Sequence, residues 1–150
     1  MKRAHNVDIE MDVKVDMNEK DGNGRDGEEE QQHLDCQHVS MESQELHAVP
    51  FEAISLHART ENDKAVDILS INLKRNRLSV VVTELYSFIS LHTLDLSRNK
   101  IHTISPGISQ LVHLERLILL SNKLKISTIP LDELEAMSQL VHIDFRCTFM

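Results

Sequence analysis

The chain has 150 residues, a formal net charge of −8 and no tryptophan, which suits one domain with an aliphatic core. Neither half carries the basic face that nucleic acids or anionic membranes attract, and no stretch has the roughly 20 apolar residues of a membrane-spanning helix. The basic start lacks a following apolar segment, so we expect no signal peptide, a cytoplasmic location and reduced thiols at Cys36 and Cys147.

An acidic tail is predicted over residues 1–44. It contains 5 Lys/Arg and 12 Asp/Glu, and it has too few large apolar residues to offset the entropy of folding. We therefore predict that the tail is mostly disordered. Residues 7–17 alternate apolar and charged side chains, as a strand does. We favour a solvated segment here, and the alternative is a strand that adds to a sheet edge of this chain or of a partner.

Two metal-binding patterns lie in the tail. Residues 19–30 resemble a calcium-binding EF-hand loop, with Gly24 at the turn and Glu30 at the last ligand position. Glu19 replaces the usual first aspartate, however, and the preceding residues lack a helical apolar face. A second pattern consists of His33, Cys36 and His38. It offers three ligands where structural zinc takes four, so we predict no metal and no cofactor, and we keep calcium-responsive regulation as an alternative function.

A degenerate leading repeat or N-terminal cap is predicted over residues 45–67. Apolar residues between Leu46 and Leu56 suggest a short helix with Pro50 in its first turn. A polar stretch over residues 59–64 then ends the pattern.

Residues 68–150 contain a repeated pattern of apolar residues and one asparagine. The matching positions are Ile68, Ile71, Leu73, Asn76 and Leu78, then Leu91, Leu94, Leu96, Asn99 and Ile101, then Leu114, Leu117, Leu119, Asn122 and Leu124. The period is 23 residues, and a fourth unit begins 26 residues later at Leu140, with Thr148 in the asparagine position. Behind the first two units, Val81, Leu85 and Phe88 match Ile104, Ile108 and Leu111 at helix-like spacing.

This pattern resembles the leucine-rich-repeat family, L-x-x-L-x-L-x-x-N-x-L with a period of roughly 20–29 residues. The resemblance covers residues 68–150, and the 23-residue period is similar to that of intracellular members that act in signalling. It implies an α/β solenoid with short parallel strands on a concave face. It also implies a protein that binds other proteins and is not an enzyme.

The physics of the pattern favours the same architecture. The fourth and sixth positions of each unit alternate, which predicts a strand of about three residues with one face in the core, and stacked copies form a parallel sheet. An asparagine amide both donates and accepts, so it can satisfy turn groups that lack strand partners. We therefore predict a structural ladder of Asn76, Asn99 and Asn122.

The last unit stops soon after its strand, and we expect the chain to be a fragment, a truncated isoform or an incomplete gene model. Leu140, Ile143 and Phe145 would then lie at an uncapped end. Self-association through this end is a second alternative function.

The outward-facing strand residues are the predicted partner contacts. They are Asn72, Lys74, Arg75, Asp95, Arg98, Arg116, Ile118, Leu120 and Asp144. Ile118 and Leu120 are apolar at outward positions near arginines, which is the composition of a binding hot spot. The alternative is that they only support strand formation or cover an edge. We predict no catalytic residues, because the chain has no Gly-rich phosphate loop and no G-x-S-x-G elbow.

Overall fold

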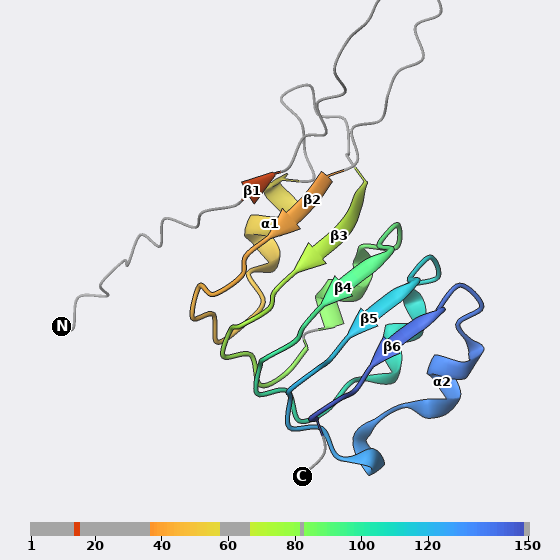
Figure 1. The fold of residues 1–150 in the computed structure, drawn as a ribbon. Helices are drawn as coiled ribbons and strands as arrows, with labels where there is room; N and C mark the ends of the chain where they lie inside the picture. The colour runs from red at the N-terminus through yellow and green to blue at the C-terminus, as the bar shows by residue number, and fades with distance from the viewer. Residues whose placement is uncertain (1–13, 16–36, 58–66, 82, 149–150) are drawn as a thin grey trace, which may run out of the picture.

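The computed structural model describes residues 14–15, 37–57, 67–81 and 83–148, drawn in colour in Figure 1. The elements in chain order are β1 (Lys14–Val15), β2 (Gln37–Ser40), α1 (Phe51–His57), β3 (Ile68–Asn72), η1 (Thr83–Ser87), β4 (Thr93–Asp95), η2 (Pro106–Gln110), β5 (Arg116–Ile118), η3 (Ile126–Thr128), α2 (Leu131–Ala136) and β6 (His142–Asp144). The η elements are 3-10 helices.

All six strands form one sheet in sequence order, β1-β2-β3-β4-β5-β6. Strands β2 to β6 are parallel, whereas β1 runs antiparallel to β2 at the edge. The register follows the sequence repeat, since Ile71 lies opposite Leu94 and Leu94 lies opposite Leu117. One strand per coil thus forms the α/β leucine-rich-repeat solenoid that the sequence predicts (Figure 1).

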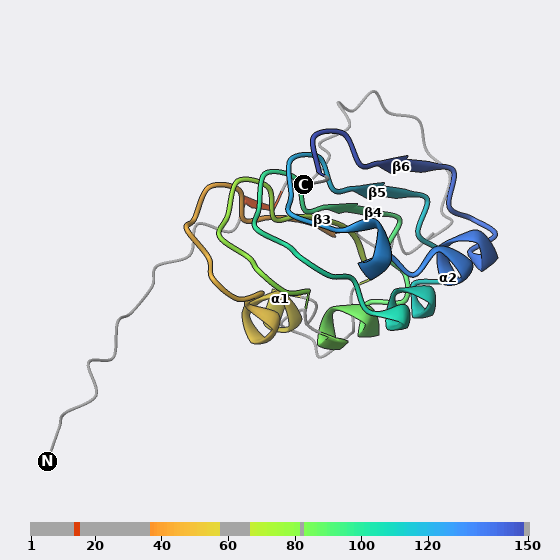
Figure 2. The ribbon, with the colours of Figure 1, turned by 90° about the horizontal axis from the view of Figure 1, so that it is seen from below.

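The solenoid has two layers, with the sheet on one side and the helices on the other (Figure 2). Aliphatic side chains from both layers fill the space between them, and most strand leucines are fully buried. In the two 23-residue coils the return segments are the five-residue 3-10 helices η1 and η2, which suits the little chain left there. The longer leading coil and the 26-residue unit have room for the α-helices α1 and α2. Ser105 caps η2 by accepting a hydrogen bond from the N–H of Gly107, and Pro106 occupies its first turn.

The first coil of the sheet begins earlier than the sequence indicates. Val39 and Met41 are buried at the positions that Ile71 and Leu73 hold in the next coil. Our predicted tail boundary at residue 44 therefore needs correction, because residues 37–44 belong to the leading coil. That coil is 32 residues long and has Gln44 in the asparagine position, so the 23-residue pattern does not reveal it.

Strand β1 lies within residues 7–17, which alternate apolar and charged side chains. Lys14 pairs with Ser40 and Val15 with Val39, so these two residues adopt the edge-strand alternative rather than the solvated one. The EF-hand-like loop over residues 19–30, as well as His33 and Cys36, lie outside the described residues.

The three asparagines connect neighbouring coils through buried hydrogen bonds. The Asn99 amide donates to the carbonyls of Leu73 and Leu96, at 2.9 and 3.0 Å, and accepts from the N–H of Leu78 at 3.1 Å. Asn122 repeats this set with Leu96, Leu119 and Ile101. Asn76 reaches back to the leading coil, where it donates to Met41 and accepts from Gln44 and Leu46. Thr148 makes only the donor half, to the Leu119 carbonyl at 2.8 Å.

The last coil is less buried than the coils before it. Leu140, Ile143 and Phe145 are half-buried and pack against the core. Their counterparts Leu114, Leu117 and Leu119 are fully buried. The end predicted to be uncapped is thus partly covered by its own coil.

Candidate functional site

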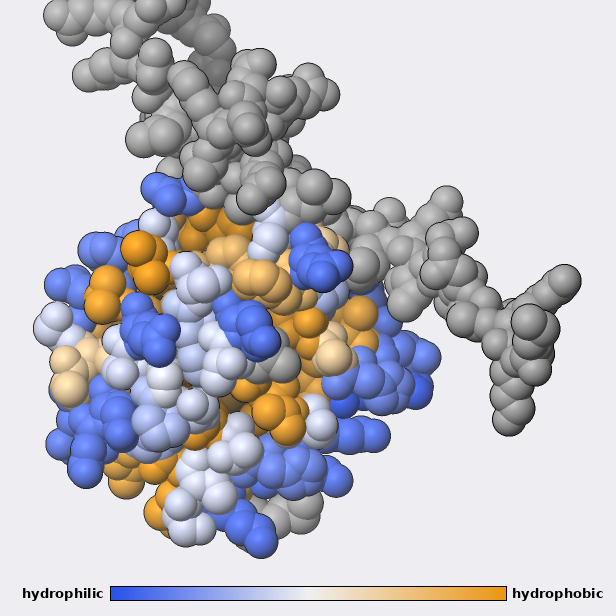
Figure 3. Space-filling model, turned by 180° about the vertical axis from the view of Figure 1, so that it is seen from behind, coloured by the Kyte–Doolittle hydropathy of each residue, from blue (hydrophilic) through white to orange (hydrophobic). Residues whose placement is uncertain are grey.

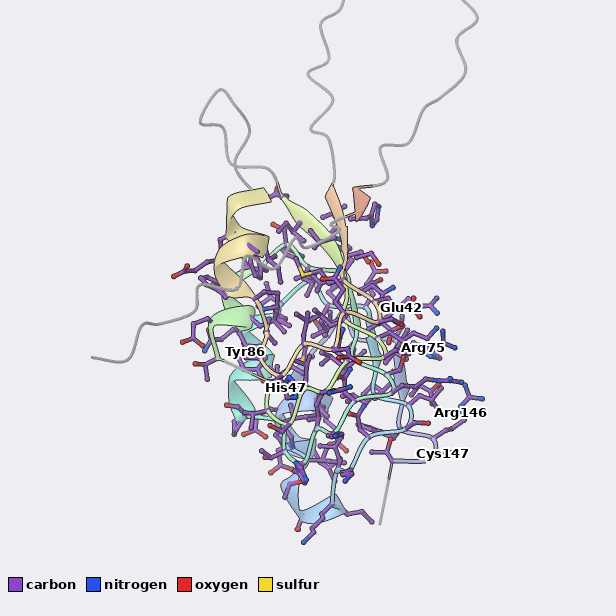
Figure 4. All side chains as sticks on the ribbon, turned by 90° about the vertical axis from the view of Figure 1, so that its left-hand side faces the viewer. Glu42, His47, Arg75, Tyr86, Arg146 and Cys147 are labelled. Carbon is purple, nitrogen blue, oxygen red and sulfur yellow. The ribbon has the colours of Figure 1, made fainter. Side chains whose placement is uncertain are left out.

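The candidate site is the side of the sheet that faces away from the helices, which we call the open sheet face. Its outward residues form columns that cross the parallel strands at equal repeat positions. The two central columns are Asn72, Asp95, Ile118 and Asp144, and Lys74, Ser97, Leu120 and Arg146. Figure 4 shows Glu42, Arg75 and Arg146 projecting together from this side. The two columns contain Asn72, Lys74, Asp95, Ile118, Leu120 and Asp144 of the predicted partner contacts. Asp144 is buried among them, as is the neighbouring Ser97.

Three of the four members of the first column cap the turn after their own strand. The Asn72 Oδ1 accepts from the N–H of Lys74 at 3.0 Å, and the Asp95 Oδ1 accepts from Ser97 at 2.8 Å. The Asp144 Oδ1 accepts from Arg146 at 3.0 Å. Such turns are a common local role of Asx side chains. Asn72, Asp95 and Asp144 were predicted as partner contacts, and the structure gives them this second role.

Ile118 is the exception in the column. An isoleucine has no acceptor, so the N–H of Leu120 lacks the cap that the equivalent groups receive after Asn72, Asp95 and Asp144. Among the described residues this N–H has no hydrogen-bond partner. In the leading coil Ser40 lies opposite Asn72, and the N–H of Glu42 has no such hydrogen bond among the described residues either. Ile118 and Leu120 are both half-buried at outward positions. We number the coils after the leading one by their sequence units, so that Asn72, Asp95, Ile118 and Asp144 lie in the first, second, third and fourth coils. The third coil therefore combines an apolar surface with an uncapped backbone donor.

Ion pairs divide the basic residues of the open sheet face into two groups. Lys74 and Arg75 both contact the Glu42 carboxylate of the leading coil, at 3.8 and 3.5 Å. The sequence pattern does not indicate Glu42, because its pairing with Lys74 and Arg75 depends on where the leading coil lies. Arg98 and Arg116 are exposed and form no ion pair within the described part of the chain.

Arg146 belongs to the paired group. Its guanidinium donates to both oxygens of Asp144, with the shortest contact 2.7 Å. These hydrogen bonds are the main reason that the pKa of Asp144 falls to about 2, and the same contact raises the pKa of Arg146. Asp144 is thus ionised, and the positive charge of Arg146 balances its negative charge.

A turn residue with positive φ precedes each ladder position. The φ angles are 57° at Arg75, 55° at Arg98, 56° at Ser121 and 52° at Cys147. None of these residues is glycine, although the left-handed region costs other residues roughly 1–2 kcal/mol. The Arg98 N–H donates to the Leu120 carbonyl at 2.7 Å, so this turn places Arg98 beside the uncapped coil.

The helix side of the molecule offers a more scattered surface. Apolar patches there are separated by polar residues (Figure 3). Two exposed apolar residues lie in the return segments: Val112 shortly after η2 and Ile126 at the start of η3. They are 54% and 67% exposed, and neither occupies an outward strand position. These exposed apolar residues do not align in columns as the outward residues of the open sheet face do.

Tyr86 is a buried titratable group beneath the helix side. It is fully buried, and a Cβ added to Gly107 would come within 3.0 Å of its ring. Burial raises the pKa of Tyr86 to about 12, and the backbone of Ser105 offsets this only in part. The hydroxyl forms no hydrogen bond of normal geometry to a described residue. Its place in the interior (Figure 4) separates it from the open sheet face.

Groups suited to metal or covalent chemistry are sparse in the described segments. They contain no cluster of three His, Cys, Asp or Glu side chains that could hold a metal ion. Cys147 is exposed with a free thiol, and His38 is exposed on β2. None of the helices described is long and apolar enough to cross a membrane.

Comparison with family models agrees with this architecture. The family model described as Leucine Rich Repeat matches residues 90–111. Among solved structures, the BIR2 ectodomain from Arabidopsis thaliana is similar, with 30% sequence identity and a TM-score of 0.42. The alignment covers 50% of this chain and 40% of that one, so the chain spans less than half the length of this neighbour. No curated protein matches the chain.

Proposed function

Because the chain is a leucine-rich-repeat protein, we propose that it is a non-catalytic module whose open sheet face binds a protein partner. We further propose a cytoplasmic role as an adaptor or regulatory scaffold, which the 23-residue period supports through its similarity to intracellular members of the family. The partner contacts are the unpaired arginines and the apolar residues of the third coil.

The observation that carries this proposal is the exception at Ile118. The equivalent residue in three other coils is an Asx that satisfies a backbone N–H. At Ile118 this hydrogen bond is lost and an apolar side chain faces outward. A local departure from a stabilising rule is typical of functional positions.

Leu120 and the two unpaired arginines extend the site. Leu120 lies two residues after Ile118 in the same coil, and Arg116 begins the strand that ends at Ile118. The N–H of Arg98 donates to the Leu120 carbonyl, which places the Arg98 backbone beside the pair. An apolar centre beside arginines matches the composition of interface hot spots. In contrast, Lys74, Arg75 and Arg146 already have carboxylate partners, so we expect a smaller contribution from them.

Affinity capture from cells with quantitative mass spectrometry tests the proposal. The test variant is Ile118→Asp with Leu120→Ser, which copies the residues of the second coil and is expected to remain folded. The control is Val112→Ser, which removes an exposed apolar side chain and copies Ser138 of the next unit. We expect specific partners to be lost with the test variant and kept with the control. Partners that persist with a folded test variant would place binding elsewhere.

Self-association through the last coil is a second candidate function. Leu140, Ile143 and Phe145 are less buried than their counterparts in the third coil. Sedimentation velocity over a range of protein concentrations tests it, with Phe145→Ser expected to shift the population towards monomer. A natural chain that is monomeric at all concentrations would exclude this function.

A further inference from the structure

The uncapped N–H of Leu120 indicates the chemistry of the partner, and this inference rests on the proposed function. We propose that the partner presents the carboxylate of an Asp or Glu side chain, which accepts a hydrogen bond from the Leu120 N–H. The partner thereby supplies from outside the turn cap that the first, second and fourth coils contain within their own sequence. Arg98 and Arg116 flank this carboxylate.

The neighbouring coils define where the carboxylate binds. In the second coil the Asp95 oxygen lies 2.8 Å from the Ser97 N–H, and in the fourth the Asp144 oxygen lies 3.0 Å from the Arg146 N–H. The third coil has the same register in the sheet, so its N–H at Leu120 occupies the equivalent place. An acceptor at that point completes a geometry that the fold already uses on both sides.

The charges around this point favour an anionic acceptor. Asp144 is neutralised by Arg146, so Asp95 is the neighbouring acidic group in the column without a cationic partner in the described residues. The two positive charges of Arg98 and Arg116 exceed the single negative charge of Asp95, and neither arginine forms an ion pair in the described residues. Hydrogen bonds from guanidinium groups and N–H groups to a carboxylate are stronger than those to a neutral acceptor.

The apolar residues define the rest of the ligand. Ile118 and Leu120 are half-buried beside the donor, and they leave room for aliphatic contact next to the carboxylate. A segment with an acidic residue between apolar ones therefore matches the site. A neutral segment that contributes only a backbone carbonyl would leave both arginines unpaired.

Solution NMR of the full chain, labelled with nitrogen-15, tests this inference. The probe is the blocked tripeptide acetyl-Leu-Asp-Leu-amide, and its neutral counterpart is acetyl-Leu-Asn-Leu-amide. We expect the aspartyl peptide to shift the Leu120 amide resonance in a saturable way and to bind about fivefold tighter than the neutral peptide, because bonds to a charged acceptor are about twice as strong. Added salt should weaken the aspartyl peptide more than the neutral one.

Two variants complete the test. Ile118→Asp supplies the cap within the chain, so this variant should melt at or above the temperature of the natural chain and show no Leu120 shift with either peptide. Ile118→Val leaves the donor uncapped and should retain the preference for the aspartyl peptide. Equal affinity for both peptides, or a Leu120 shift that persists in Ile118→Asp, would overturn the inference.

The outcome is distinguishable from failure of the proposed function. If neither peptide shifts Leu120 while captured partners still depend on Ile118 and Leu120, the carboxylate inference fails and binding by the open sheet face stands. If captured partners are also unaffected by the variants, both proposals fail.

Discussion

Removing the amide of Asn99 should destabilise the solenoid more than most single substitutions. Asn99→Ala leaves the N–H of Leu78 without its partner and removes one of two side-chain hydrogen bonds from each of the Leu73 and Leu96 carbonyls. Those carbonyls keep the hydrogen bonds from Asn76 and Asn122. Asn99 is only 7% exposed, so water replaces the lost hydrogen bonds poorly. One unsatisfied buried group costs about 1–3 kcal/mol, and each of the two other lost hydrogen bonds contributes about 0.5–1.5 kcal/mol, so we expect a total loss of about 3 kcal/mol in the free energy of unfolding.

Asn99→Asp separates the donor role of the amide from its acceptor role. The carboxylate can still accept from the Leu78 N–H, but its second oxygen faces the two carbonyls that the amide contacts at 2.9 and 3.0 Å. At pH 7 this variant should therefore be less stable than Asn99→Ala. The folded state should raise the pKa of the new carboxyl group above the unfolded value near 3.9. Relative stability is then present below that value and is lost as the pH rises through the folded pKa.

Urea denaturation, followed by circular dichroism at pH 7 and pH 3, measures both effects. Each variant is compared with the natural chain at the same pH, and Lys100→Ala, at an exposed neighbouring residue, serves as the control. A loss below about 1 kcal/mol for Asn99→Ala would refute the reasoning, since it would mean that water satisfies the ladder groups. Equal stability of the Ala and Asp variants at both pH values would refute the assigned donor role.

Three further predictions follow from the site and the core. Tyr86 is the single tyrosine, so ultraviolet absorbance should show phenol ionisation near pH 12. Ionisation near pH 10 in a folded chain would contradict its burial. The low pKa of Asp144 gives stability that is present above its ordinary value of 3.8 and is lost as the pH falls towards 2. In Asp144→Asn the free energy of unfolding should therefore depend less on pH in this range. An unchanged dependence on pH would exclude that contribution. Arg98→Gly should raise the melting temperature, because glycine accepts a φ of 55° without strain, whereas Arg98→Val should lower it. The reverse order of melting temperatures would argue against strain at this turn.

The repeated part of the fold was predictable because its spacing directly reflects the backbone. The alternating apolar residues at the fourth and sixth repeat positions, such as Leu94 and Leu96, are buried, so their spacing predicts the strand and its register. The leading coil escaped prediction because its length and Gln44 both depart from the repeat. The return segments were predicted only as helical, since the spacing of Val81, Leu85 and Phe88 suits more than one helix type.

The sequence predicts which residues face outward on the open sheet face, but it does not predict which of them form ion pairs. Alternation alone places Lys74 outward, but it does not show that Glu42 from another coil pairs with it. The capping role of Asp95 has a local sequence signal, because an Asx side chain often binds the N–H two residues later. Comparing the residues of this column between units would have identified Ile118 as the one that cannot cap.

The antiparallel strand β1 gives the two ends of the sheet different capacities for assembly. A second copy that continued the solenoid head to tail would need to lay its own strand along β2, and β1 already pairs there. Strand β6 has no such neighbour among the described strands. Association through β6 would therefore join two copies by the same edge, in a closed pair with twofold symmetry. Open-ended filaments require two different complementary surfaces, and β1 changes one of them from a parallel edge to a two-residue antiparallel edge.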